Sequence, residues 1–235
     1  MNFMSAQPAK RERRGGVKPR PAIEVAAPAD EDTPAERRKR KVRDTIIEAA
    51  ENVFAQEGEA GLSMRRLADR IDYSPAAIYK YFASKDELLA AIREQFFERL
   101  LTRMSPEAEG ASPAKRFRAG LRAYIQTGLE NPNHYRMGFA NIGSGPPTEG
   151  TRAYEAATTF TAMIVELIAD GSFRKVDPQL ASASAWASMH GLTNLLTSIP
   201  DFPRGLGPGS PPISRDALIE FHVEQVCRGL AHATA

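Results

Sequence analysis

The sequence predicts an all-α protein, with a small N-terminal three-helix unit followed by a larger helical body. The first observation is a recurrent capping residue followed by proline, a pair typical of helix starts. These pairs are Ser74-Pro75, Ser112-Pro113, Asn131-Pro132 and Asp177-Pro178. The second is that alternating runs of β-branched residues, which indicate strands, do not occur in the sequence. The caps and the apolar spacing between them predict about nine helices.

The helices follow in order from these signals. The first begins at Thr33-Pro34-Ala35-Glu36, a capping box with proline at the first helical position. Ser84 and Glu87 form a second capping box. The predicted ranges are Pro34–Glu57, Met64–Ile71, Pro75–Phe82, Lys85–Met104, Pro113–Glu130, Pro132–Asn141, Glu149–Ala169, Pro178–Ser198 and Arg215–Ala231. A loop rich in proline and glycine, residues 200–212, separates the last two helices.

Three segments divide the chain. Residues 1–32 combine basic residues, glycine and proline with few large apolar side chains, so we expect a disordered basic tail. Such a tail could touch a DNA backbone or be an inert extension. Residues 33–84 form the N-terminal unit and residues 85–235 form the body. The apolar stripe in Lys85–Met104 is typical of a long helix that has one end in each of two cores.

Composition excludes several classes of protein. The 235 residues carry a formal net charge of only +2, so affinity for nucleic acid must come from locally placed charge. Cys227 is the single cysteine, which leaves no disulfide framework or thiolate metal cluster and fits a reducing cytoplasm. No apolar stretch is long enough for a membrane span or the core of a signal peptide. We therefore expect a cytoplasmic protein with no cofactor, no metal and no membrane partner.

The most informative segment is Ser63–Lys85, which predicts two short helices joined by a tight turn. Ser63 is the candidate N-cap of the first helix. Asp72 lies where the chain turns with a positive φ, a conformation that aspartate tolerates. Ser74 and Pro75 open the second helix. That helix presents small and hydroxylated residues with almost no acid, which favours insertion into a DNA major groove.

One face of the second helix is apolar and the other is free for DNA. Ile78 and Phe82 are four residues apart and face inward. Two alanines at the helix start allow close approach to base edges, and the tyrosines and lysines supply base or phosphate contacts. The predicted DNA-binding residues are Arg43, Ser63, Arg65, Ser74, Pro75, Ala76, Ala77, Tyr79, Lys80, Tyr81 and Lys85. The alternative is an ordinary helical hairpin packed in a core.

The densest basic run, residues 36–43, occupies the start of the first helix, next to the expected DNA face. Arg38, Lys39, Arg40, Lys41 and Arg43 could neutralise DNA phosphates. The alternative is a solvated helix face that binds nothing.

Residues 43–89 resemble the N-terminal domain of the TetR family of transcriptional repressors. The most specific elements are Ile-Tyr-Lys-Tyr-Phe at residues 78–82 and Ser-Lys-Asp-Glu-Leu-Leu at residues 84–89. One departure is Asp72, where the family often has glycine. Residues 131–139 and 186–192 are similar to the C-terminal domain of the TetR subgroup that has a Trp-His-Gly signature. The resemblance implies a DNA operator, a homodimer and an effector pocket in the body.

The resemblance also implies dimerisation through the last two long helices. Small residues along Pro178–Ser198 permit close helix approach, and Arg215–Ala231 offers apolar residues such as Phe221 and Val223. Packing within one subunit is the alternative. The ligand-binding candidates are Tyr124, Met137, Phe139, Phe160, Met163, Ile164, Trp186, Met189 and His190. They are either core residues or the lining of a mostly apolar pocket for a small hydrophobic or aromatic effector.

The sequence offers no catalytic constellation, so we expect no enzyme. The four histidines lie in no metal-ligand spacing, and no Gly-rich phosphate loop or nucleophile elbow occurs. Ser188 and His190 are two residues apart on a helix and point to different faces. We therefore expect a sequence-specific DNA-binding regulator with a helix-turn-helix domain and a helical effector and dimerisation domain. It would be a repressor released from a palindromic operator by its effector; the alternative is an architectural DNA-binding factor without an effector.

Overall fold

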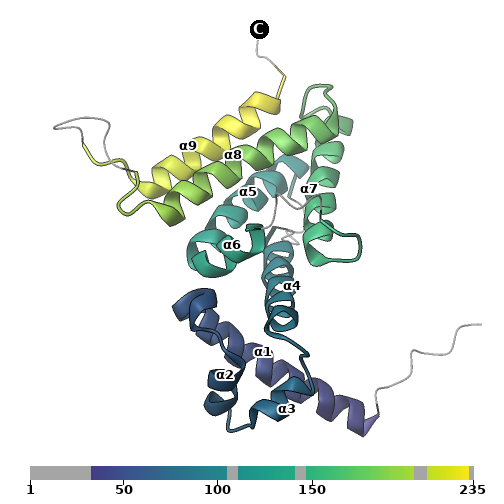
Figure 1. The fold of residues 1–235 in the computed structure, drawn as a ribbon. Helices are drawn as coiled ribbons and strands as arrows, with labels where there is room; N and C mark the ends of the chain where they lie inside the picture. The colour runs from purple at the N-terminus through teal and green to yellow at the C-terminus, as the bar shows by residue number, and fades with distance from the viewer. Residues whose placement is uncertain (1–32, 105–110, 141–146, 204–210, 233–235) are drawn as a thin grey trace, which may run out of the picture.

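The computed structural model describes residues 33–104, 111–140, 147–203 and 211–232. Nine helices account for the regular structure of these residues, apart from one isolated β-bridge between Phe173 and Ala231. The helices are α1 (Pro34–Gly61), α2 (Met64–Arg70), α3 (Pro75–Tyr79), α4 (Lys85–Met104), α5 (Pro113–Glu130), α6 (Pro132–Phe139), α7 (Arg152–Ala169), α8 (Pro178–Ser198) and α9 (Arg215–Leu230). The predicted all-α class is confirmed (Figure 1).

The predicted caps explain where several helices begin. The Thr33 hydroxyl accepts a hydrogen bond from the Glu36 backbone N–H at 3.3 Å, and the Glu36 carboxylate accepts one from the Thr33 N–H at 2.7 Å. The side chains of Ser74, Ser112 and Asp177 likewise accept backbone N–H bonds from the first turns of α3, α5 and α8. Each cap satisfies a donor that the first turn of a helix leaves without a partner.

Some predicted helix ends differ from the structure. α1 continues past Glu57 to Gly61, because Gly58 takes a φ of 65° and kinks the helix without ending it. α3 ends at Tyr79, earlier than expected, and the chain continues as a turn. α7 begins at Arg152, later than expected, because the residues before it turn through a glycine with a φ of 84°. The predicted end of α6, at residue 141, lies outside the described residues.

Two buried clusters form the interior, and α4 contributes to both. The N-terminal cluster consists of Ile46, Ile47, Ala50, Val53, Phe54, Leu62, Met64, Leu67, Ala68, Ile78, Phe82, Leu88, Leu89, Ile92 and Met137. The body cluster takes Phe96, Phe97, Leu100 and Met104 from α4 and its other buried members from the chain beyond it. The sequence-based expectation that Lys85–Met104 has one end in each core is therefore confirmed.

The helices form two regions that lie at opposite ends of α4 (Figure 1). α1, α2 and α3 surround one end, and α8 and α9 lie side by side at the far side of the body. Because α4 runs through both cores, the predicted domain boundary between residues 84 and 85 stays a prediction. The predicted basic tail, residues 1–32, lies outside the described residues. None of the helices in the described ranges combines the length and apolarity that a membrane crossing requires.

Candidate nucleic-acid interface and effector site

The turn between α2 and α3 has the geometry that the sequence predicts. Asp72 adopts a φ of 57°, so the aspartate occupies the left-handed conformation expected at this position. Ser74 caps α3, its hydroxyl accepting from the Ala77 N–H at 3.2 Å. Ile78 and Phe82 are fully buried in the N-terminal cluster. These two anchors fix which face of α3 points away from the protein.

The outward face of α3 is exposed along its length. Ser74, Pro75 and Ala76 are exposed, and the Tyr79 side chain is 52% exposed despite its large apolar ring. Lys80 is exposed beside it. An exposed aromatic residue next to small residues and a lysine is typical of a surface that meets a partner. The structure therefore presents most of the predicted recognition residues on one surface.

Two residues predicted to be exposed on that surface are instead half-buried. Ala77 is half-buried, and Tyr81 packs against the N-terminal cluster. Tyr81 was expected to face outward because Ile78 and Phe82 were expected to form the inward face. The helix ends before it, however, so the chain turns back and brings the Tyr81 ring onto the core.

The other predicted contacts in this region have mixed roles. Ser63 caps α2 by accepting from the Arg66 N–H at 3.2 Å, whereas Arg65 is exposed. Lys85 donates to the Glu59 carbonyl at 2.9 Å and lies 3.9 Å from its carboxylate, so it ties α4 to the end of α1. Ser63 and Lys85 therefore make contacts within the free protein that stabilise it, and their contact with DNA stays a prediction.

The basic run of α1 lies next to α3. Residues 36–41 and Arg43 are exposed along the first turns of α1, a segment that extends beyond the N-terminal cluster (Figure 1). The Arg43 guanidinium lies 4.8 Å from the centre of the Phe82 ring, a cation–π contact that links this run to the residues following α3. Positive charge that the sequence separates from α3 is thus placed near the end of this helix.

In the body, four of the predicted ligand residues gather around one another. The rings of Phe139, Trp186 and His190 are in contact, with His190 stacked on Trp186 at 5.3 Å and Phe139 edge-on at 5.0 Å. Tyr124 joins them through its hydroxyl, which lies 3.2 Å from His190 Nδ1. We call these residues, with Tyr135, the aromatic cluster. Trp186 and His190 are four residues apart on α8, so the sequence spacing does place them on one face.

Tyr135 is the member of the aromatic cluster that sequence reasoning missed. Its hydroxyl lies 2.5 Å from His190 Nδ1 and 3.1 Å from the Tyr124 hydroxyl. Burial raises the pKa of Tyr135 to about 12, and burial with the Tyr135 contact raises the pKa of Tyr124 well above its ordinary value. Both tyrosines are therefore neutral hydrogen-bonding groups at neutral pH. Burial also lowers the pKa of His190, which favours the neutral ring.

The remaining ligand candidates pack in the two buried clusters. Met137 faces away from the aromatic cluster and packs in the N-terminal cluster, because α6 lies against α1. Phe160 stacks on Phe117 at 5.7 Å, and Ile164 is fully buried in the body cluster. Met163 packs against that cluster, and Met189 is buried in it. Met137 therefore lies in the other core, whereas the other four belong to or pack against the same body cluster as Tyr124 and Tyr135, and a shared pocket stays a prediction.

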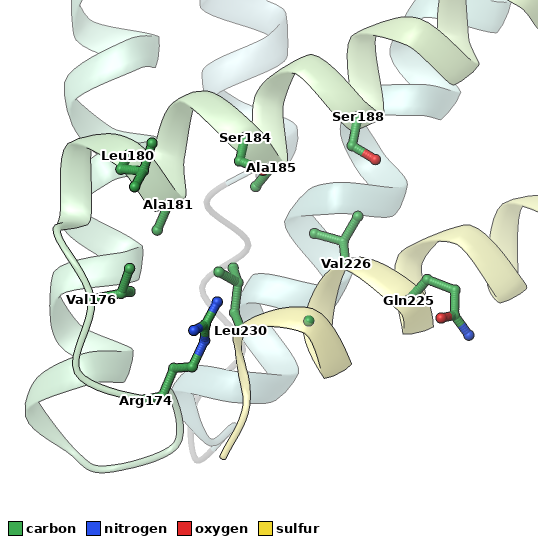
Figure 2. Close-up of a pocket in the computed structure, with 11 residues that line it drawn as sticks. Arg174, Val176, Leu180, Ala181, Ser184, Ala185, Ser188, Gln225, Val226 and Leu230 are labelled. Atoms are coloured by element: carbon green, nitrogen blue, oxygen red, sulfur yellow. The ribbon is translucent and has the colours of Figure 1, made fainter. Parts of the chain in front are cut away.

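A groove of about 450 Å³ opens between α8, α9 and the chain before α8 (Figure 2). It is lined by Arg174, Val176, Leu180, Ala181, Ser184, Ala185, Ser188, Gln225, Val226, Gly229 and Leu230. None of the predicted ligand residues lines this groove. The small residues of α8 that were expected to allow close helix approach therefore border an open space at the surface.

The outer faces of α8 and α9 carry exposed apolar side chains. Leu180 is 65% exposed, Leu195 43% and Phe221 62%. Ala185 and Val223, by contrast, are buried inside the subunit, at 4% and 0% exposure. These two side chains pack within the subunit because α8 and α9 also pack on α5, and the predicted subunit interface stays a prediction.

The polar contacts in the body agree with the predicted orientation of Ser188 and His190. The Ser188 hydroxyl lies 3.1 Å from His222 Nε2 on α9, whereas His190 faces the two tyrosines. Within the described ranges, three or more His, Cys, Asp and Glu side chains nowhere converge in a way that could hold a metal ion.

Comparisons with known proteins match both regions. Residues 46–92 match the model for bacterial regulatory proteins of the tetR family, and residues 117–225 match the tetracyclin repressor-like C-terminal domain. An uncharacterised HTH-type transcriptional regulator in the dhlA 5′ region of Xanthobacter autotrophicus is 38% identical over 88 residues, which is 36% of this chain and 44% of that protein. The chain thus spans less than half the length of that relative.

Two further matches cover most of the chain. The HTH-type transcriptional activator FasR of Mycolicibacterium smegmatis is 24% identical over 197 residues, which is 81% of this chain and 83% of FasR. A solved TetR-family transcriptional regulator from Pectobacterium atrosepticum has a TM-score of 0.65 at 23% identity. That match covers 87% of this chain and 100% of the solved one, and it shows a shared fold.

Proposed function

This chain belongs to the TetR family of bacterial regulatory proteins, and we propose that it is a homodimeric transcriptional regulator that binds a palindromic DNA operator. The observation that carries the proposal is the exposed face of α3 with the basic run of α1 near the end of that helix. In the dimer, each subunit would insert its α3 into one of two successive major grooves. In this proposal the protein binds its operator in the cytoplasm.

The chemistry of the exposed faces of α1 and α3 supports different roles for the two helices in DNA binding. The exposed arginines and lysines of α1 would neutralise phosphates, which gives affinity without sequence preference. Tyr79 and Lys80, together with the small residues at the start of α3, would contact base edges and phosphates. Specificity would therefore depend on α3, and the dependence of binding on salt would come mainly from α1.

The outer faces of α8 and α9 support the homodimer. Leu180, Leu195 and Phe221 are each more than two-fifths exposed to solvent in the single subunit. A patch of this kind is stabilised when the same surface of a second subunit covers it around a two-fold axis. The groove between α8 and α9 would receive side chains of the second copy.

The aromatic cluster supports a small effector. Buried polar atoms of Tyr124, Tyr135 and His190 converge within an otherwise apolar and aromatic environment. Sites for small molecules combine an apolar lining with a few convergent polar groups of this kind. We propose a small hydrophobic or aromatic effector that bears a hydroxyl or carbonyl group. Its binding would tilt α4 and change the separation of the two α3 helices.

We favour repression relieved by the effector as the mode of regulation. FasR is named an activator, so the fold itself is compatible with either sign. The alternative function is an architectural DNA-binding factor with no effector. A ligand that changes operator affinity separates a regulator from an architectural factor.

Selection of bound sequences from random double-stranded DNA tests the proposal. We expect the recovered sequences to converge on an inverted repeat, because two symmetric copies of α3 read two half-sites. Recovery of unrelated sequences, or of none, would contradict the assignment of α3 as a recognition helix. The selected operator then serves as the probe in the experiments below.

Neutralising two basic residues of α1 should flatten the dependence of binding on salt. In the variant Arg38→Gln with Lys39→Gln, the slope of log affinity against log salt should fall in magnitude by about two units. Anisotropy titrations of the operator at several salt concentrations give this slope. The control is Lys115→Gln with Lys175→Gln, two exposed lysines of the body. Equal slopes in all three proteins would mean that the basic run is a solvated helix face that does not contact DNA.

The effector proposal predicts a response from Trp186, the only tryptophan of the chain. Titration with phenol and its simple derivatives should change Trp186 emission saturably and weaken operator binding. Tyr135→Phe keeps the ring but removes the hydroxyl, and should weaken phenol binding about ten-fold, the effect of one hydrogen bond. Tyr154→Phe, at an exposed tyrosine of α7, is the control. Operator affinity that no small molecule changes would favour the architectural alternative.

A further inference from the structure

α6 connects the two regions of the protein through three consecutive residues. Asn133 and His134 face α1, and Tyr135 faces the aromatic cluster on the other side. The side-chain amide of Asn133 donates to the carbonyls of Phe54 and Ala55 at 3.2 and 2.9 Å. Those carbonyls lie one turn before the kink at residue 58, where a bent helix leaves acceptors poorly satisfied. α6 is therefore docked on α1 by specific polar contacts.

His134 is the unusual member of this contact. Its side chain is 3% exposed, and neither ring nitrogen has a hydrogen-bond partner within the described residues. The ring packs edge-on against Phe54 at 5.0 Å. A buried polar group without a partner destabilises the conformation that contains it. Docking of α6 on α1 therefore buries an imidazole that would gain hydrogen bonds if it were exposed to water.

Burial and the Arg99 guanidinium hold His134 neutral. Glu51 on α1 is the nearest, with its Oε1 3.9 Å from His134 Nε2, too far for a hydrogen bond. Arg99 on α4 donates hydrogen bonds to both Glu51 carboxylate oxygens, at 2.8 and 3.0 Å. The Gln95 side-chain amide, oriented to donate, lies 3.1 Å from each of the same oxygens. The carboxylate is therefore engaged away from the imidazole, while the Arg99 guanidinium repels a second positive charge. Burial, and then Arg99, lower the pKa of His134 to about 4.

We propose that His134 makes the docking of α6 on α1 sensitive to protonation, so that acidification releases α6 from α1. Protonation would place a second cation beside Arg99 in a dry contact, whereas release would expose the ring to water. The contact itself stands on the geometry above. Its consequence for regulation rests on the proposed function, because operator binding needs two DNA-binding units held in register.

The sign of the effect follows from linkage. The released state has an ordinary histidine pKa near 6.5, whereas the docked state has one near 4. Docking is therefore most favourable above about pH 6.5 and weakens as the pH falls toward 4. Between pH 7.5 and pH 5.5 the ratio of docked to released molecules should fall about ten-fold.

Native-state hydrogen exchange of the α6 amides measures this ratio directly. A helix of eight residues is not stable alone, so released α6 unfolds and its amides exchange. After correction for the intrinsic exchange rate at each pH, protection of α6 in the native protein should fall about ten-fold between pH 7.5 and pH 5.5. In His134→Phe, which keeps a ring on Phe54 but cannot titrate, it should stay constant. His134→Leu is the second variant, should the larger ring disturb the fold.

The outcomes separate the proposal from the function on which it rests. His232→Gln is the control and should keep the full pH response. Equal pH dependence in the native protein and in both His134 variants would overturn the proposal and point to His190, which bonds to α6 through Tyr135. Constant protection in the native protein would overturn it as well. Because exchange is measured without DNA, neither result depends on the protein having an operator.

Discussion

Replacing Phe221 with glutamate is expected to convert the dimer to monomers and to weaken operator binding by about 100-fold or more. The Phe221 side chain is 62% exposed on α9, so the change leaves the subunit interior intact. In a two-fold interface, two such carboxylates would lie near each other and lose their water, which is costly for unpaired charges. A monomer then binds with one α3 and loses the gain from linked binding, which is on the order of 10²–10⁴.

Light scattering and operator titration check this prediction together. Ala162→Glu, at an exposed position of α7, is the matched control and should remain a dimer with normal binding. A native protein that is monomeric at micromolar concentration would remove both the interface and the palindromic mechanism. Charges at Ala185 or Val223 would not be informative, because those side chains are buried within the subunit and their substitution would unfold it.

The faces of α8 and α9 show where sequence reasoning reached its limit. α8 carries small and apolar residues around most of its circumference, so its pattern identifies no single inward face. In α9 the buried residues Ile219, Val223, Val226 and Leu230 have the spacing of one helical face, a signal that the sequence-based interpretation did not use. The helix starts, by contrast, depend on local chemistry, and the predicted caps at Ser74, Ser112 and Asp177 are present. The predicted cap at Asn131 is wrong, because its side-chain amide donates to the Thr127 carbonyl and makes no cap hydrogen bond to α6.

The same distinction applies to the candidate sites. The outward face of α3 could be predicted because two buried residues four apart, Ile78 and Phe82, fix its orientation. In the body, Trp186 and His190 share a face of α8 for the same reason. Tyr135 and His134 are adjacent on α6 and face opposite regions, so no spacing in the sequence assigns either of them a partner. Met137 was misplaced because α6 packs on α1 as well as on the body.

The second large effect is expected at α3. Tyr79→Ala or Lys80→Ala should weaken operator binding by about 1–3 kcal/mol where a base contact is lost, which is about five- to 150-fold. Both side chains are exposed, so unfolding temperatures should stay close to that of the native protein. Mobility-shift titrations with the selected operator give the affinities.

A second DNA probe shows whether the loss is specific. Loss of a base contact at Tyr79 should narrow the preference between the operator and a scrambled duplex, whereas loss of a phosphate contact at Lys80 should weaken both probes alike. Tyr154→Ala removes a tyrosine that is 39% exposed on α7, a helix of the body, and should leave both affinities unchanged. If Tyr79→Ala and Lys80→Ala both bind the operator as tightly as this control, α3 is not the recognition helix, and the exposed face that the structure presents there has another use.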